Sequence, residues 1–353
     1  MIKALYIGKI ELDDITAEGT GYCIMKNVSL KARGASPCGG VSKSRMQIIA
    51  EDLKRNRLVY LMVLPVLLYY LLFCYLPMVG IGIAFKDYTV TKLGNSFIQN
   101  LIESRSVGLR YFKEFFTSAS FGQIMTNTLK ISLVSIVFGF PAPIILALLM
   151  NELETPRFKR CVQTLTYLPH FISLVVICGM IKMFTNEGGI ISLAWAAFTG
   201  SEPVNMMLYP EMFVPIYVIS DIWQEMGWGS IIYLSALTGV SRELYEAAAI
   251  DGAGRWKQTI HVTLPCIMPT IAIMLILRLG NILNVGYEKI ILLYNDLTRP
   301  AAEVISTYVY EKGLLDRNYG FSTAVGLFNS VVNIVFLAGS NALSRRFSEV
   351  SLW

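Results

Sequence analysis

Charged residues are scarce in this sequence of 353 residues, because Asp, Glu, Lys and Arg together make up only 16% of it. Soluble domains carry about a quarter of such residues. Apolar residues reach 54%. This composition argues against an ordinary soluble domain and predicts a protein that lies largely in a lipid bilayer. We expect no nucleic-acid partner.

Histidine and cysteine are also few. The two histidines, His170 and His261, have no partner histidine at the spacing of metal ligands. The six cysteines, at positions 23, 38, 74, 161, 178 and 266, form no close pair. We therefore expect neither a metal site nor a cofactor.

Catalytic motifs are missing as well. The sequence contains no Walker-type phosphate loop, no GxSxG nucleophile elbow and no other set of catalytic residues. The chain is therefore not expected to be an enzyme or to bind ATP. If ATP drives its activity, the hydrolysing subunit must be a separate polypeptide.

Long uncharged runs determine the fold class. Such a run can cross a hydrocarbon core of about 30 Å, which takes about 20 helical residues. Four runs carry no charge: residues 58–85, 131–151, 161–181 and 318–344. Two weaker spans carry charged residues: residues 212–240 contain Asp221 and Glu225, and residues 264–287 contain Arg278. The sequence thus predicts an all-α membrane protein with six transmembrane helices.

Lysine and arginine predict the orientation, because they gather on the cytoplasmic side of membrane proteins. Residues 185–211, between the third and fourth spans, contain neither. Basic residues instead cluster before the first span, in two loops and after the last span: Lys54, Arg55, Arg57, Arg157, Lys159, Arg160, Arg242, Arg255, Lys257, Arg345 and Arg346. Both termini are therefore expected in the cytoplasm.

The loop at residues 246–265 reads EAAAIDGAGRWKQTIHVTLP. Its alanines favour helix, and their small side chains let another protein approach one helix face closely. Gly252 can take the left-handed conformation that ends a helix. We expect a short helix, a sharp turn and a second short helix at the cytoplasmic surface. Leu244, Tyr245 and Ala248 can share one face of the first helix.

This loop resembles the EAA loop of membrane subunits of binding-protein-dependent ABC importers, the carbohydrate-uptake permeases. The matching positions are Glu246, Ala247, Ala248, Gly252 and Pro265. Further strings resemble the polysaccharide or lipoprotein permease subgroup: LPHFIS at 168–173, SDIWQEMGWGSIIYLSAL at 220–237 and SLW at 351–353.

The resemblance implies a type I ABC importer permease fold in a bacterial inner membrane. It implies that the chain forms half of the path for a carbohydrate, an oligosaccharide. The implied partners are a second related permease chain in a heterodimer, two copies of a cytoplasmic ATPase, and an extracytoplasmic solute-binding protein. The residues implied to couple the chain to the ATPase are Glu246, Ala247, Ala248, Asp251, Gly252 and Ala253.

The N-terminal part differs in composition from the rest. Residues 1–47 mix polar and small residues without a run long enough to insert, and they lack the layout of a signal peptide. We expect a disordered polar extension there. Residues 48–353 are expected to form the permease domain.

Polar residues within the spans are candidates for a substrate path, because charge in hydrocarbon is costly. Sugars need amides and carboxylates for their hydroxyls and aromatic faces for their C–H surfaces. We expect Trp223, Glu225, Asn281, Asn284 and Tyr287 to line this path. The last three, spaced by three, can share one helix face, although Gly280 and Gly286 favour a break. Asp221 and Arg278 are interpreted as structural.

Two other function classes remain open on the residues alone. An ion-coupled secondary transporter could relay protons through Asp221, Glu225 or Glu288, but its internal repeats are not evident. The other class is a membrane-embedded scaffold or enzyme, but the sequence shows no set of catalytic residues for an enzyme. The importer subunit is the preferred hypothesis.

Overall fold

The computed structural model describes Met46, residues 52–88, residues 96–347 and Leu352. These residues are almost entirely helical and contain no β-strand, although an isolated β-bridge joins Lys86 to Ser106. The all-α prediction is confirmed. The predicted polar extension at residues 1–47 lies outside the described residues, apart from Met46.

The helices follow one another along the chain with short connections. The α-helices of the described part are α2 (Arg57–Tyr69), α3 (Phe97–Glu103), α4 (Arg110–Thr117), α5 (Phe121–Val134), α6 (Pro141–Asn151), α7 (Pro156–Tyr167), α8 (Leu174–Thr185), α9 (Ile190–Thr199), α10 (Pro210–Thr238), α11 (Arg242–Ile250), α12 (Arg255–Gln258), α13 (Leu264–Leu279), α14 (Tyr287–Leu293), α15 (Arg299–Ala302), α16 (Ile305–Tyr310) and α17 (Tyr319–Phe347). Wider π-helical turns occupy Tyr70–Tyr75, Ser135–Gly139, Thr259–Thr263 and Glu311–Leu315, and tighter 3-10 turns occupy Leu76–Phe85, Leu168–Phe171 and Met206–Leu208.

The chain divides into two compact units, residues 1–68 and residues 69–353. In the first unit, the described residues lead into α2. There, Asp52 accepts hydrogen bonds from Asn56 Nδ2 (2.7 Å) and Tyr60 Oη (2.6 Å). The apolar side chains of residues 58–68 are exposed, as expected of a helix surrounded by lipid.

Five helical stretches among the described residues are long and apolar enough to cross a membrane: Arg57–Phe85, Phe121–Asn151, Leu174–Thr199, Arg255–Leu279 and Tyr319–Arg346. The predicted span at residues 212–240 corresponds to α10, which is 29 residues long. It carries Glu211, Asp221 and Glu225 and is not one of the five. The count of six spans depends on α10 and stays a prediction.

The predicted continuous span at residues 161–181 is wrong. The helix α7 ends at Tyr167, a 3-10 turn follows, and the backbone is extended at Ile172 and Ser173 before α8 begins. Pro169 accounts for the end of α7, because proline lacks an N–H and its ring clashes with the carbonyl four residues earlier in a regular helix. The apolar stretch that can span begins instead at Leu174 and runs through α9.

Prolines also shape the span that contains α5 and α6. Pro141 opens α6, and its ring would clash with the carbonyl four residues earlier in a regular helix. A π-helical turn at Ser135–Gly139 precedes it and absorbs this irregularity.

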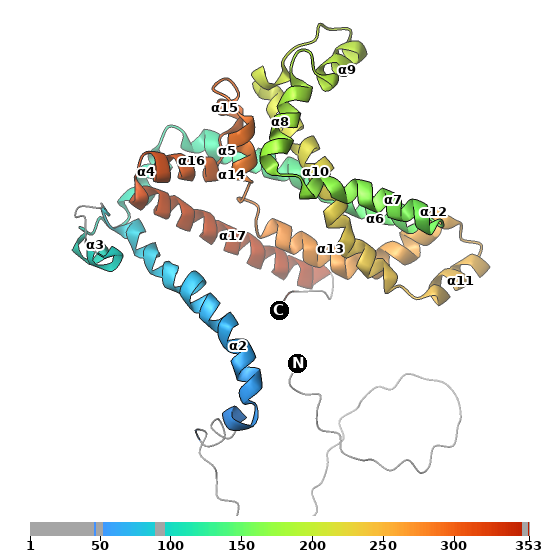
Figure 1. The fold of residues 1–353 in the computed structure, drawn as a ribbon, viewed down its shortest axis with the longest axis horizontal. Helices are drawn as coiled ribbons and strands as arrows, with labels where there is room; N and C mark the ends of the chain where they lie inside the picture. The colour runs from blue at the N-terminus through green and yellow to red at the C-terminus, as the bar shows by residue number, and fades with distance from the viewer. Residues whose placement is uncertain (1–45, 47–51, 89–95, 348–351, 353) are drawn as a thin grey trace, which may run out of the picture. The chain divides into compact units, whose positions relative to one another are not determined.

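The second unit is organised around α10. This helix contacts α6, α7, α13 and α15, while α17 contacts α13, α16 and the turn at residues 76–85 (Figure 1). Gly227 of α10 permits a close approach to the end of α7, because a Cβ there would lie 2.0 Å from the carbonyl oxygen of Thr166. Only glycine fits this crossing without a shift of the backbone.

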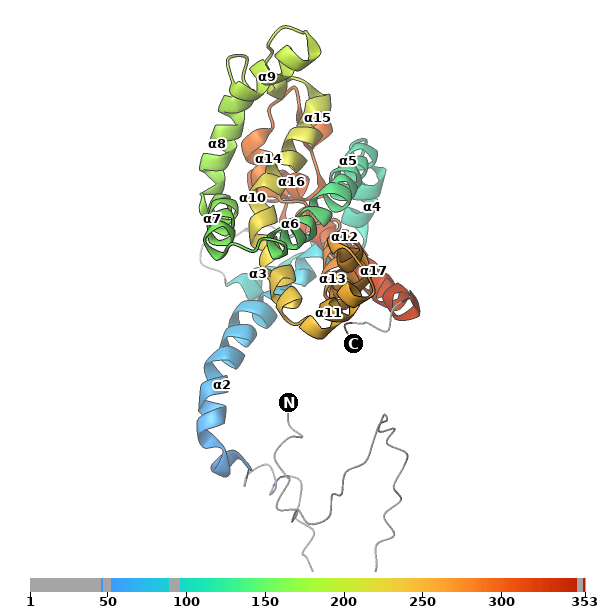
Figure 2. The same cartoon turned by 90° about the vertical axis from the view of Figure 1, so that its right-hand side faces the viewer.

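The two ends of the second unit carry different elements. In both views, α9 and α15 lie at one end, whereas α11 and α12 lie at the other (Figures 1 and 2). The basic loop at residues 246–265 is therefore separated from the connection at residues 185–211, which has no lysine or arginine.

Gly227→Ala should lower the free energy of unfolding of the second unit by about 1–3 kcal/mol, because overpacking a close contact forces a backbone shift. Thermal unfolding of the purified protein in detergent measures this change. The matched control is Gly179→Ala in α8, where a Cβ meets nothing within 4 Å. Equal stability of the two variants would show that the close crossing does not constrain α10.

Candidate functional site

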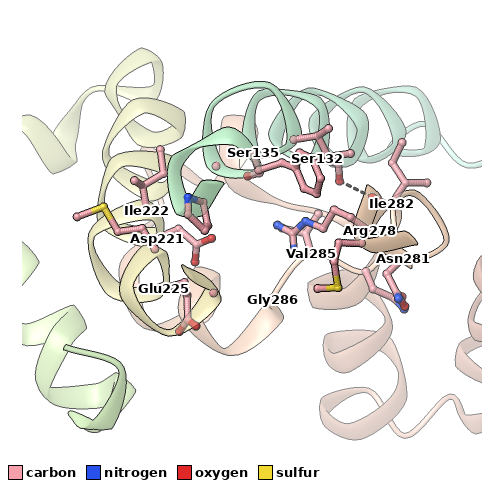
Figure 3. A pocket seen from close by; sticks show the side chains of 18 of the residues that line it. Ser132, Ser135, Asp221, Ile222, Glu225, Arg278, Asn281, Ile282, Val285 and Gly286 are labelled. Carbon is pink, nitrogen blue, oxygen red and sulfur yellow. Dashed lines mark hydrogen bonds between the residues drawn. The ribbon is translucent and has the colours of Figure 1, made fainter. Parts of the chain in front are cut away.

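A polar cavity of about 510 Å³ lies within the second unit. Its walls come from α5, α6 and the π-helical turn between them, from α10, and from the end of α13 with the segment that follows (Figure 3). The polar or charged side chains that line it are Ser132, Ser135, Tyr217, Asp221, Glu225, Trp228, Tyr233, Arg278, Asn281 and Asn284.

The broken backbone after α13 forms one wall of this cavity. The helix ends at Leu279, and residues 280–286 are not helical, so the predicted break in the span at residues 264–287 is confirmed. The backbone groups freed by the break are satisfied from neighbouring helices. Ser132 Oγ donates to the carbonyl of Ile282, and Asn333 Oδ1 accepts from the amide of Leu283 at 3.2 Å.

A third such bond comes from α16, where Ser306 Oγ donates to the carbonyl of Val285 at 2.9 Å. Irregular backbone at membrane depth is tolerated where it is buried in protein or lines a cavity. Side chains of α5, α16 and α17 thus form the hydrogen bonds that the backbone of this segment cannot form within a helix.

Asp221 of α10 forms an ion pair with Lys289 of α14, with 3.2 Å between Oδ1 and Nζ. The lysine side chain is only 5% exposed, and its ammonium also lies 5.2 Å from the centre of the Tyr217 ring. The structural interpretation of Asp221 is supported. Lys289 was missed from the sequence, although a lysine within an otherwise apolar segment is itself a signal of a buried ion pair.

Glu225 has its own partner on the 3-10 turn after α7. His170 Nδ1 lies 3.0 Å from Glu225 Oε2. The imidazole also stacks on Trp228, with ring centres 4.6 Å apart and planes within 2°. Pro169 and Gly227 bring this turn against α10, so His170, which had no assigned role in the sequence, contacts a residue of the cavity wall.

The structure separates the residues predicted to line a path. Glu225, Asn281 and Asn284 line the cavity. Tyr287 lines an adjoining pocket together with Glu225 and His170. Trp223 is 41% exposed and lies on another face of α10, outside the cavity lining.

The predicted shared helix face of Asn281, Asn284 and Tyr287 is wrong, because the two asparagines precede α14 in the non-helical segment. They are nevertheless linked, since Asn284 Nδ2 donates to Asn281 Oδ1 at 3.2 Å. Asn284 Oδ1 in turn accepts from Asn329 Nδ2 of α17 at 2.8 Å. The asparagines therefore both line the cavity and join this segment to α17.

The loop at residues 246–265 has the predicted form of a helix, a turn and a second helix. Gly252 has φ +77°, so the expected left-handed conformation is confirmed. The amide of Gly252 donates to the carbonyl of Ala249 (3.0 Å), and that of Ala253 donates to Ala248 (2.9 Å). This pair of bonds defines a Schellman motif, which fixes the direction of the chain after α11.

One side-chain bond links the two ends of the loop, and one exposed ion pair joins the loop to the segment before α7. Tyr245 Oη and Thr263 Oγ1 are hydrogen-bonded at 2.9 Å, and Arg255 pairs with Glu154 before α7 at 2.5 Å. Tyr245 and Ala248 are half-buried, so most of the face predicted at Leu244, Tyr245 and Ala248 packs inward.

The outward surface of the loop carries two large apolar side chains. Ile250 is 87% exposed and Trp256 is 76% exposed, and Glu246 and Ala247 are exposed near them in the sequence. Sequence reasoning did not single out Ile250 or Trp256. A rigid knob with exposed apolar residues is a surface suited to a protein partner.

Membrane-length helices, a polar cavity beside a broken helix and a rigid surface loop define a membrane transport subunit. The family of binding-protein-dependent transport system inner membrane components matches residues 139–349. The chain belongs to this family, which is a family of multi-pass membrane permeases. That membership decides against the secondary transporter and the scaffold or enzyme considered above.

Characterised relatives extend the match beyond the family model. Protein LplB of Bacillus subtilis is 43% identical over 302 residues, covering 85% of this chain and 92% of that protein. The polygalacturonan/rhamnogalacturonan transport system permease protein YteP of the same organism is 41% identical over 312 residues, covering 88% and 95%.

A solved structure has the same fold. The crystal structure of a bacterial ABC transporter involved in the import of the acidic polysaccharide alginate contains a chain 41% identical to this one, with a TM-score of 0.76. The match covers 85% of this chain and 99% of that chain. The same transporter in complex with an alginate pentasaccharide-bound periplasmic protein matches with a TM-score of 0.76 and 42% identity, covering 86% and 99%.

Lys289→Met should lower the free energy of unfolding by about 2 kcal/mol, because it leaves the partly buried Asp221 carboxylate unpaired. Adding Asp221→Asn should restore much of this loss, so that the double variant is more stable than the sum of the single changes predicts. Thermal unfolding of all four proteins measures the coupling. Strictly additive effects would contradict the ion pair.

Proposed function

We propose that this chain is the permease subunit of an ATP-driven importer and forms half of the translocation path for a carbohydrate, an oligosaccharide. The observation that carries the proposal is the polar cavity beside residues 280–286, in a chain of the binding-protein-dependent permease family. An extracytoplasmic binding protein delivers the sugar in this proposal. The support is the similar alginate transporter, whose structure includes an alginate pentasaccharide-bound periplasmic protein.

The chemistry of the cavity suits a sugar. Its walls carry amides, hydroxyls and two carboxylates, which exchange hydrogen bonds with sugar hydroxyls. The exposed side chain of Trp228 adds aromatic surface, against which the C–H face of a pyranose ring can pack. Tyr287 extends this surface into the adjoining pocket. We propose Glu225, Asn281, Asn284 and Tyr287 as path residues; Trp223 would act only through a face outside this cavity.

The loop at residues 246–265 is proposed as the docking point of a separate ATPase. Its turn is closed by two backbone hydrogen bonds, and Ile250 and Trp256 are exposed on its outer surface among charged residues. The Tyr245–Thr263 bond links its two ends, and Arg255 pairs with Glu154 before α7. A rigid connection is needed, because closure of the ATPase can move the membrane helices only if the loop does not yield. Glu246, Ala247, Ala248, Asp251, Gly252 and Ala253 are the coupling residues of this proposal.

The assembly follows from the same reasoning. We propose six spans with α10 as the fourth, a permease domain at residues 48–353, and both termini in the cytoplasm with the coupling loop. The separation of α9 from α11 at opposite ends of the second unit supports this orientation. One chain encloses half a path, so a second related permease and two ATPase copies complete the importer.

Gly252→Val should abolish ATP-driven uptake while membrane abundance is unchanged, because a β-branched residue is strained at φ +77°. Uptake and co-purification of the ATPase are the measurements. The control is Gly254→Val, since Gly254 has φ −68° and ψ 167°, which valine accepts. Normal uptake by Gly252→Val would contradict the coupling role.

Asn284→Leu should lower sugar uptake about tenfold or more, because it removes a donor and an acceptor from the cavity wall. Asn329→Leu is the matched control: it breaks the same bond to Asn284 but lies outside this cavity lining. Radiolabelled sugar uptake at equal membrane abundance measures both. Equal losses would mean that Asn284 acts only by joining the segment to α17.

A further inference from the structure

Three charged side chains line the cavity, and two of them have partners. Asp221 is paired with Lys289, and Glu225 is hydrogen-bonded to His170. The third is Arg278, near the end of α13. Among the described residues the side chain of Arg278 makes no hydrogen bond and no ion pair, in contrast to the two carboxylates.

Arg278 lies in a stretch long and apolar enough to cross the membrane, Arg255–Leu279. A cation at such a position is costly unless it faces a cavity or finds an anion. Its side chain is exposed, and Figure 3 shows the guanidinium extending from the α13 side into the open space, across from Asp221 and Glu225 on α10. The charge is therefore presented to whatever occupies the cavity.

Neutral hydrogen-bonding groups accompany this charge. Ser135 lines the same cavity, and its hydroxyl makes no hydrogen bond among the described residues. Asn281 lines the wall beyond Arg278. A guanidinium presents a planar fork of donors that matches a carboxylate with two parallel hydrogen bonds. Hydroxyl and amide groups beside it match sugar hydroxyls.

We infer that Arg278 binds the carboxylate of an acidic sugar, so that the path is selective for oligosaccharides containing uronic acids. This inference rests on the proposed function, because it assumes that the cavity is the sugar path. It revises the structural interpretation of Arg278. The ion pair of Lys289 with Asp221 keeps the buried lysine from competing for the same carboxylate.

The test compares Arg278→Gln with the native chain in the complete importer, with partner permease, ATPase and binding protein reconstituted in proteoliposomes. The probes are uronate trisaccharides (galacturonate, glucuronate and mannuronate), each paired with its methyl ester, which removes the charge and little else. The ratio of variant to native uptake cancels the preference of the binding protein, since both complexes use the same one.

Arg278→Gln should lower uptake of a uronate trisaccharide about tenfold or more and change uptake of its methyl ester less than about twofold. Arg278→Lys, which keeps the charge but not the fork, should fall between. Lys130→Gln is the control: Lys130 is an exposed cation on α5 outside the cavity lining, and its loss should leave both sugars unaffected.

Equal loss of acid and ester, or loss of the complex itself, would overturn the inference in favour of a purely structural Arg278. Unchanged uptake of the acid by Arg278→Gln would also overturn it. A native complex that imports only the esters would refute the acidic selectivity and leave the proposed function standing. A native complex that imports neither class would refute the proposed function and the inference with it.

Discussion

The need to satisfy backbone hydrogen bonds inside the membrane governs this structure. A helix satisfies them internally, so each break must be compensated by protein side chains. At residues 280–286 that compensation comes from Ser132, Ser306 and Asn333, on three different helices. Of these helices, α5 also lines the polar cavity beside the break, together with α6, α10 and the end of α13. Asn329 and Asn333 join the same segment to α17.

The same principle explains the loop at residues 246–265. The end of α11 is closed by its own backbone through the left-handed Gly252 and two hydrogen bonds. The loop therefore keeps its shape without support from a partner, and Ile250 and Trp256 stay outside. The loop leads directly into α13, whose far end borders the cavity. This connection is the one through which we propose that the ATPase acts on the sugar path.

Local patterns in the sequence predicted the local features. Uncharged runs predicted most of the membrane helices, the alanines and Asp251-Gly252 predicted the coupling turn, and Gly280 and Gly286 predicted the break in α13. Pairings between distant parts of the chain were not predictable in this way. Lys289 lies 68 residues from Asp221, and His170 lies 55 residues from Glu225. Trp223 lies outside the cavity lining, because residues next to each other in sequence point to different sides of a helix.

The central claim is that the segment after α13 lines a water-filled sugar path. Its most direct test is the reactivity of Asn281→Cys with a small membrane-impermeant thiol reagent, in the assembled importer with its native cysteines replaced. Leu277→Cys, one turn earlier and outside the cavity lining, is the reference. We expect Asn281→Cys to react, to be protected when the sugar-loaded binding protein is present, and to react faster than Leu277→Cys. An unreactive Asn281→Cys, or equal reactivity at the two positions without protection, would contradict the account.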